Sequence, residues 1–187
     1  MKLNPSEFAL SKMLNIKFPI IVAPMFLVSN KEMIIESINA GITGAIPALN
    51  YRSVEELRSA IKEIKQETKG PFGINIIVNK SNFYYKEQLR ICCEEKVDFL
   101  ITSLGSPEET IKMAHQNGVK VFCDVVDVKY AKKVEALGAD AIIAVNKEAG
   151  GHAGSTSYME LIPLLKSECT IPIISAGGVG NGFEAKK

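Results

Sequence analysis

Short apolar runs recur along this chain of 187 residues, each followed by a polar turn, an amphipathic stretch and often a glycine. Near-continuous apolar runs of this length are typical of parallel strands that are buried on both faces. Amphipathic stretches between them indicate helices that cover the sheet. The seven runs are Pro19–Ala23, Gly44–Ala48, Gly73–Val78, Phe99–Thr102, Val119–Cys123, Ala141–Ala144 and Pro172–Ala176. The pattern therefore predicts seven parallel strands alternating with helices.

Helix boundaries are marked by capping residues. Ser53 and Glu56 form a capping box at the start of one helix, and Ser106 caps another whose first helical residue is Pro107. Asp127 is a candidate cap for a helix that begins at Val128. Glycines that can adopt the left-handed conformation end three of the helices. The glycines are Gly41, Gly118 and Gly138. Helices are expected over Lys31–Ala40, Ser53–Lys65 and Tyr158–Lys166.

The spacing of the units favours a barrel. The turn after the first run, Pro24–Phe26, lacks the glycine fingerprint of a dinucleotide-binding sheet. Seven regular units instead predict an α/β fold, a (β/α)8 TIM barrel, which typically needs about 250 residues. Because Phe183–Lys187 resembles the opening of a helix, we expect one domain over residues 1–187, truncated after the seventh strand. A complete doubly wound sheet of seven strands is the alternative.

Composition narrows the function classes. Lys and Arg number 22 against 21 Asp and Glu, which gives no electrostatic reason to expect nucleic acid or an acidic membrane as partner. No apolar run approaches the roughly 18 residues of a membrane span, and the N-terminus lacks the features of a signal peptide. We therefore expect a cytoplasmic protein. The chain has only two histidines, and its four cysteines, two of them adjacent, form no C-x-x-C pair, so we expect no metal site and free buried thiols.

The loop after the sixth apolar run contains the residues best suited to catalysis or ligand binding. In Glu148–Gly154 a Gly-Gly pair, Gly150 and Gly151, precedes His152. Paired glycines let the backbone lie close to a ligand, and histidine is the side chain whose ordinary pKa lies nearest neutrality. His152 is thus a candidate proton-transfer residue, with a structural role in the loop as the alternative. Glu148 could orient it, bind a ligand hydroxyl, or be a solvated carboxylate.

Other strand ends are small and apolar, and they expose backbone. Ser175–Gly178 follows the seventh strand, where barrels commonly bind phosphate; a tight turn is the alternative. Asn75 lies in an otherwise apolar strand, where an unpaired amide would cost about 1–3 kcal/mol, so a ligand or a backbone group must pair with it. Met25 and Phe26 could belong to the core.

Four motifs in register resemble the nitronate monooxygenase (2-nitropropane dioxygenase) family, whose superfamily includes FMN-dependent enoyl-acyl-carrier-protein reductases. The resemblance extends from Ile16 to Gly182. It rests on Ala23–Met25, Pro71–Asn75, Gly138–Ala141 with Glu148–Gly154, and Pro172–Gly178.

The resemblance implies a barrel that binds FMN non-covalently. It places Ala23, Pro24 and Met25 along the flavin ring and Asn75 in contact with it. It assigns the catalytic role to His152. It places Gly150 and Gly151 in the loop beside the ring. Gly177 and Gly178 then form half of the phosphate-binding site.

The expected activity is that of an FMN-dependent oxidoreductase that oxidises nitronates or nitroalkanes with O2, with a histidine base beside the flavin. The alternative within the superfamily is an FMN-dependent enoyl-acyl-carrier-protein reductase using NAD(P)H. An alternative of another class is a catalytically inactive barrel fragment. Expected partners are a small-molecule substrate, a nitronate or an enoyl thioester, with a homodimer as one option and neither nucleic acid nor membrane.

Overall fold

A computed structural model describes residues 8–179, whose contacts form two compact units, one up to Val121 and one from Phe122. The expected helix at Phe183–Lys187 lies outside the described residues. The expectation of a single domain over residues 1–187 stays a prediction.

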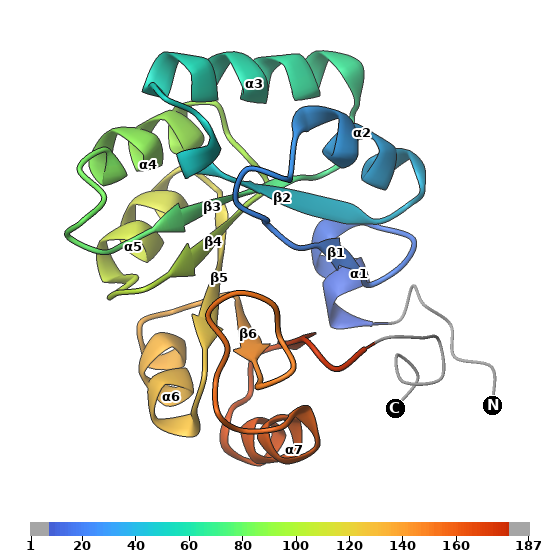
Figure 1. Ribbon diagram of the computed structural model, residues 1–187, viewed down its shortest axis with the longest axis vertical. Helices are drawn as coiled ribbons and strands as arrows, with labels where there is room; N and C mark the ends of the chain where they lie inside the picture. Colours follow the sequence, from blue (N-terminus) through green and yellow to red (C-terminus); the bar gives the residue numbers. More distant parts are fainter. Residues whose placement is uncertain (1–7, 180–187) are drawn as a thin grey trace. The chain divides into compact units, whose positions relative to one another are not determined.

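The first unit alternates short strands with helices (Figure 1). Its strands pair in parallel and follow one another in chain order. The elements are α1 (Ala9–Leu14), β1 (Ile21–Val22), α2 (Lys31–Asn39), β2 (Thr43–Pro47), η2 (Ala48–Asn50), α3 (Val54–Glu67), β3 (Gly73–Ile77), α4 (Tyr85–Glu94), β4 (Phe99–Ser103) and α5 (Glu108–Gln116). Strand β5 (Lys120–Val125) begins at the end of this unit.

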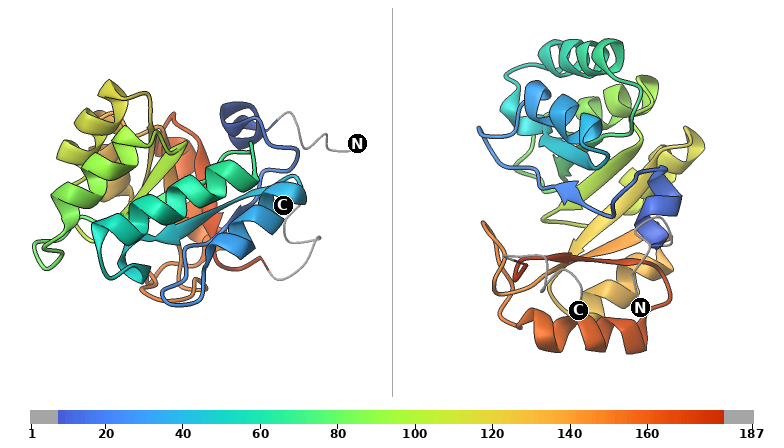
Figure 2. Two further views of the ribbon diagram at one scale, coloured as in Figure 1. Left: turned by 90° about the horizontal axis from the view of Figure 1, so that it is seen from above. Right: turned by 90° about the vertical axis from the view of Figure 1, so that its right-hand side faces the viewer.

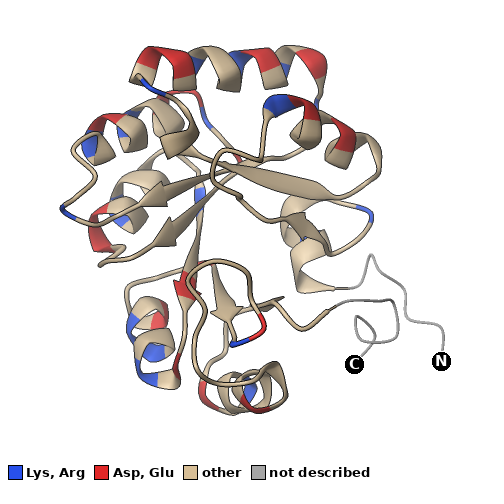
Figure 3. Cartoon of the chain, viewed as in Figure 1, with Lys and Arg blue, Asp and Glu red and all other residues tan. Residues whose placement is uncertain are grey.

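The core of the first unit lies between the sheet and its helices. Ile46, Ile74 and Leu100 are level with one another on β2, β3 and β4, and all three are almost fully buried. Ile61 and Ile64 of α3 are also fully buried. Figure 2 shows α2, α3 and α4 along the sheet, and Figure 3 shows their charges on the helices while the strands β2 to β4 carry none.

The second unit continues β5 with α6 (Val128–Ala136), β6 (Ala141–Val145), α7 (Tyr158–Glu168) and β7 (Ile173–Ala176). Strand β6 pairs in parallel with β5 and with β7. Val145 and Ala176 lie level at the carboxyl ends of β6 and β7, so the loops that follow these strands start side by side. Helices α6 and α7 pack on β6 and β7 through buried residues such as Val134 and Leu165.

The predicted fold class is confirmed. A doubly wound sheet reverses its strand order at a switch point, whereas each unit keeps chain order with parallel pairing throughout. This is the topology of a (β/α)8 barrel up to its seventh strand. Several predicted caps are also confirmed: Ser53 accepts a hydrogen bond from the N–H of Glu56, and Asp127 from that of Tyr130.

The predicted cap at Ser106 is wrong. Helix α5 begins at Glu108, with Pro107 in the N-cap position and no side-chain cap. The chain path into α5 is set earlier, because Gly105 passes so close to β3 that a Cβ there would stand 2.4 Å from the carbonyl oxygen of Val78. The preceding Leu104 has a φ of 60°. The contact with the end of β3 thus directs this turn, and the serine does not.

Candidate functional site

In the first unit, the segment Ala23–Met25 leaves β1 and is held by one serine. Ser29 Oγ accepts a hydrogen bond from the Met25 N–H at 2.9 Å and donates one to the Ala23 carbonyl at 3.2 Å. The buried hydroxyl thus pairs with both ends of the segment that includes Pro24. Because both partners are backbone groups, the segment keeps its path whatever its own side chains contact.

Asn50 holds the same loop from the end of β2. Its Oδ1 accepts a hydrogen bond from the Leu27 N–H at 2.8 Å, and its Nδ2 donates to the Ser29 carbonyl at 2.8 Å. Leu27 has a φ of 58°, a left-handed conformation that costs a non-glycine residue about 1–3 kcal/mol. The two hydrogen bonds of Asn50 offset that strain and fix the loop.

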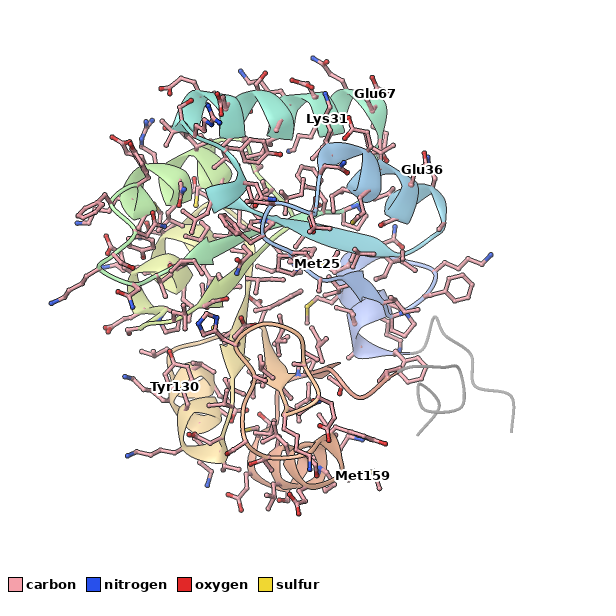
Figure 4. The ribbon with its side chains drawn as sticks, in the orientation of Figure 1. Met25, Lys31, Glu36, Glu67, Tyr130 and Met159 are labelled. Atoms are coloured by element: carbon pink, nitrogen blue, oxygen red, sulfur yellow. The ribbon has the colours of Figure 1, made fainter. Side chains whose placement is uncertain are left out.

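The alternative that Met25 and Phe26 belong to the core is wrong. Met25, labelled in Figure 4, is 38% exposed, and Phe26 is 62% exposed. Leu27 and Val28 are also exposed. A rigid loop at the carboxyl end of a strand therefore presents apolar side chains to solvent, which is a feature of ligand-contacting surfaces.

Beside this loop lies a groove of about 560 Å³. It is lined by Leu27, Val28, Asn50, Tyr51 and residues of α2 and α3. Burial, aided by two nearby glutamates, raises the pKa of Tyr51 to about 12, so its hydroxyl is protonated at neutral pH. Lys31, labelled beside α3 in Figure 4, forms an ion pair with a glutamate of that helix.

Asn75 lies in β3, level with Pro47 on β2 and Ile101 on β4, and is 8% exposed. Its Nδ2 donates to the Ile101 carbonyl at 3.2 Å and to Ser103 Oγ at 2.9 Å. Of the two kinds of partner expected for the Asn75 amide, a ligand or a backbone group, the backbone group is therefore present. Its Oδ1 accepts no hydrogen bond from the described residues, so the amide is oriented with its acceptor available.

In the second unit, the loop from β6 to α7 curves widely before it returns (Figure 1). Its two arms are joined where the Lys147 N–H donates to the Thr156 carbonyl at 2.9 Å. Glu148 accepts a hydrogen bond from the N–H of Tyr158, the first residue of α7, at 3.2 Å. This is a role that the sequence did not suggest: Glu148 caps α7, because the N-cap residue Ser157 makes no side-chain hydrogen bond to the helix.

His152 lies at the tip of this loop and is exposed. Within residues 8–179 it makes no hydrogen bond or ion pair, and Glu148 does not orient it. No hydrogen bond from the described residues therefore fixes the tautomer of this imidazole.

The two glycine pairs differ in their surroundings. A Cβ at Gly150 or Gly151 would meet nothing within 4 Å, so the described protein crowds neither position. Gly151 has a φ of +78°, which favours glycine, whereas Gly150 has no positive φ. A Cβ at Gly177 would stand 2.3 Å from the Ala149 nitrogen, and one at Gly178 would stand 2.4 Å from the Tyr158 ring. The second pair is thus packed tightly against the loop from β6.

Sequence reasoning missed three residues that shape these loops, Ser29, Asn50 and Asn146. Each is a short polar side chain in the connection that follows a strand, and each donates a side-chain hydrogen bond to a backbone carbonyl. The carbonyl lies in the same connection for Ser29 and in another one for Asn50 and Asn146. Their position after an apolar run was a signal, but only the register of neighbouring strands reveals which loop each one holds.

The cysteines are separate from this chemistry. All four are buried and outside any disulfide, as predicted. Burial raises the pKa of Cys93 to about 11 and also raises the pKa of Cys92 and Cys169. These thiols remain protonated at neutral pH and are poor nucleophiles. Across the described helices, none has both the length and the apolar character needed to cross a membrane.

Comparison with known proteins decides the family. A sequence model described as nitronate monooxygenase matches residues 7–88 and 79–186. The chain belongs to this family. The matched segments include the glycine-rich loops that follow β6 and β7.

Individual relatives agree with this assignment. A (3aS,4S,5R,7aS)-5-hydroxy-7a-methyl-1-oxo-octahydro-1H-indene-4-carboxyl-CoA dehydrogenase from Rhodococcus jostii is 32% identical over 174 residues, 93% of this chain and 48% of the relative. A probable nitronate monooxygenase from Staphylococcus saprophyticus is 26% identical, over 91% of this chain and 60% of its own length. The chain thus spans about half of the curated relatives it matches.

Solved structures support the fold. FabK from Thermotoga maritima superposes with a TM-score of 0.90 and 32% identity, over 96% of this chain and 57% of that chain. Nitroalkane oxidase from Streptomyces ansochromogenes superposes with a TM-score of 0.81 at 24% identity, over 93% of this chain and 62% of that chain. At that identity the second likeness bears on the fold alone.

Proposed function

We propose that this protein is an FMN-dependent oxidoreductase of the nitronate monooxygenase type, which oxidises nitroalkanes or nitronates with O2. The observation that carries the proposal is the loop tip Gly150-Gly151-His152. There an exposed imidazole, which makes no hydrogen bond or ion pair with the described residues, follows Gly150, a glycine that neither a positive φ nor the packing of the described protein requires. A flat ligand lying against the backbone supplies the missing reason for glycine.

The residues of the second unit fit a flavin. Gly177 and Gly178 have φ values of +98° and +75°, and their N–H groups donate to no acceptor among the described residues. Amides presented in this way bind phosphate oxygens, and the turn after the seventh strand of a barrel is a common phosphate site. We assign the phosphate of FMN to this turn and the edge of its ring to Gly150 and Gly151.

The candidate residues of the first unit also suit contact with a flavin. Ala23, Pro24 and Met25 form a fixed segment whose backbone is held by Ser29, which suits contact with a planar ring. The Asn75 amide is oriented by two acceptors on β4, and its Oδ1 remains to accept a hydrogen bond from a ring N–H. We assign these four residues to contacts with the flavin.

His152 is the base in this proposal. Its neutral imidazole takes the acidic α-proton of a nitroalkane and yields the nitronate. The flavin supplies the two-electron chemistry when bound. A homodimer and a cytoplasmic location stay predictions.

An FMN-dependent enoyl-acyl-carrier-protein reductase that uses NAD(P)H is the second candidate. The Rhodococcus jostii relative, 32% identical, is named as a dehydrogenase of a carboxyl-CoA compound, which favours a thioester substrate. In that case His152 as imidazolium donates a proton to the substrate, and NAD(P)H supplies the reducing equivalents.

One experiment separates the two candidates. Under anaerobic conditions the purified flavoprotein is mixed separately with propyl-2-nitronate, with NADH and with NADPH. The visible absorbance of the oxidised flavin is followed in each mixture. We expect the nitronate to bleach the flavin quickly and the pyridine nucleotides to do so slowly. Rapid bleaching by NADH or NADPH, with none by the nitronate, would show that the protein is a reductase.

A further inference from the structure

Asn146 is a fully buried polar residue that directly follows β6. A buried side-chain amide needs partners for both its donor and its acceptor, since leaving either unpaired is costly. The residue lies between Val145, the last residue of the strand, and the loop that carries His152. Whatever satisfies this amide therefore also fixes the base of that loop.

The partners of Asn146 come from two loops. Its Oδ1 accepts a hydrogen bond from the Glu148 N–H at 3.0 Å, within its own loop. Its Nδ2 donates to the carbonyl of Gly177 at 3.1 Å, in the turn after β7. Its backbone N–H donates to the Ala176 carbonyl at 3.3 Å, and its backbone carbonyl accepts from Ala149 at 3.1 Å.

Close packing adds to these hydrogen bonds. A Cβ at Gly177 would stand 2.5 Å from Asn146 Oδ1 and 2.6 Å from the Ala149 Cα. The two loops therefore meet backbone against backbone, with the amide of Asn146 between them. Only a residue without a side chain fits at position 177, and only a short side chain that both donates and accepts fits at position 146.

The rest of the His152 loop depends on this junction. The hydrogen bonds from Lys147 to Thr156 and from Tyr158 to Glu148 close the loop on itself, but they do not tie it to β7. Gly178 adds a packing contact with the Tyr158 ring. Asn146 makes the side-chain hydrogen bond that joins the root of the loop to the turn after β7 within the described residues.

We propose that Asn146 is a positioning residue that locks the His152 loop and the Gly177–Gly178 turn together as one rigid element. This rests on the proposed function, in which the loop contacts the flavin ring and the turn binds its phosphate. With the lock in place, the two halves of the cofactor site are held at a fixed spacing before the ligand arrives, which lowers the entropic cost of binding.

Two substitutions distinguish a role of Asn146 in joining the two loops from a role in stabilising its own loop alone. Asn146→Ala removes both side-chain hydrogen bonds. Asn146→Asp keeps an acceptor for the Glu148 N–H but loses the donor to Gly177 and sets two oxygens against each other. If Asn146 only stabilised its own loop, the aspartate variant would behave like the native protein.

Asn82→Ala is the matched control. Asn82 is also a buried asparagine after a strand, and it donates to Ile77 and Gln88 and accepts from Tyr84, all close to its own loop after β3. Its removal should lower the melting temperature without changing the loops after β6 and β7.

The test measures hydrogen exchange of residues 146–158 in flavin-free protein and, separately, the Kd for FMN by quenching of flavin fluorescence. We expect both Asn146 variants to exchange about tenfold faster or more in this segment and to bind FMN about tenfold more weakly or worse, as loss of the buried hydrogen bond to Gly177, common to both variants, predicts. Asn82→Ala should change neither quantity.

Native exchange and affinity in Asn146→Asp would overturn the proposal, as would equal weakening of FMN binding by Asn82→Ala. The exchange measurement needs no flavin. It therefore tests the role of Asn146 even if the native protein binds no FMN. Failure of the native protein to bind FMN would instead contradict the proposed function.

Discussion

Replacement of His152 by alanine should reduce turnover of a neutral nitroalkane by about 100-fold or more, the usual contribution of a general base. The same variant should oxidise a preformed nitronate at close to the native rate, because that anion has already lost its α-proton. Flavin content should stay native, since the imidazole makes no hydrogen bond or ion pair with a described residue and its loop is closed by other hydrogen bonds. Steady-state rates with 2-nitropropane and with its nitronate measure both effects.

His115→Ala is the control for this experiment. His115 is the other histidine of the chain and lies in α5, away from the strand ends that carry the candidate site. Its substitution should leave both rates unchanged. Equal loss of nitroalkane and nitronate turnover in His152→Ala would mean that the imidazole does not act as a base.

Replacement of Gly177 by alanine should destabilise the protein by about 2–4 kcal/mol, combining backbone strain with overpacking. The residue has a φ of +98°, and a Cβ would stand 2.3 Å from the Ala149 nitrogen. For a chain of this size we expect a melting temperature about 5–15 °C lower. Flavin binding should also be lost, because the turn would move away from Asn146.

Gly150→Ala provides the contrast. This glycine lacks a positive φ, and a Cβ there would meet nothing within 4 Å, so thermal unfolding should be unchanged. If the account is right, this variant still binds FMN more weakly, because only the ligand requires glycine at this position. A native melting temperature for Gly177→Ala would contradict the packing described for the turn.

Much of the fold could be predicted from apolar periodicity. The runs Gly73–Val78 and Ala141–Ala144 correspond to β3 and β6 within one residue at their ends. Buried parallel strands are unusually clear in a sequence because both faces need apolar side chains. Helix α1 was not predicted, since it has six residues and no side-chain cap.

The candidate site was less predictable. Glycine and histidine in a strand-end loop are visible in the sequence, but the sequence does not show that Gly150 is in open space while Gly177 is packed against Ala149. Nor does it show the lock at Asn146, because that residue acts through a carbonyl 31 positions away. Such partners are set by the register of β6 and β7, which pairs Val145 with Ala176.

The most direct test of the central claim is the visible absorbance spectrum of the purified protein, combined with identification of the released chromophore. We expect a yellow protein with about one flavin per chain, which heat denaturation releases as FMN, as non-covalent binding requires. A colourless protein that takes up no FMN on titration would contradict the account and favour an inactive barrel fragment.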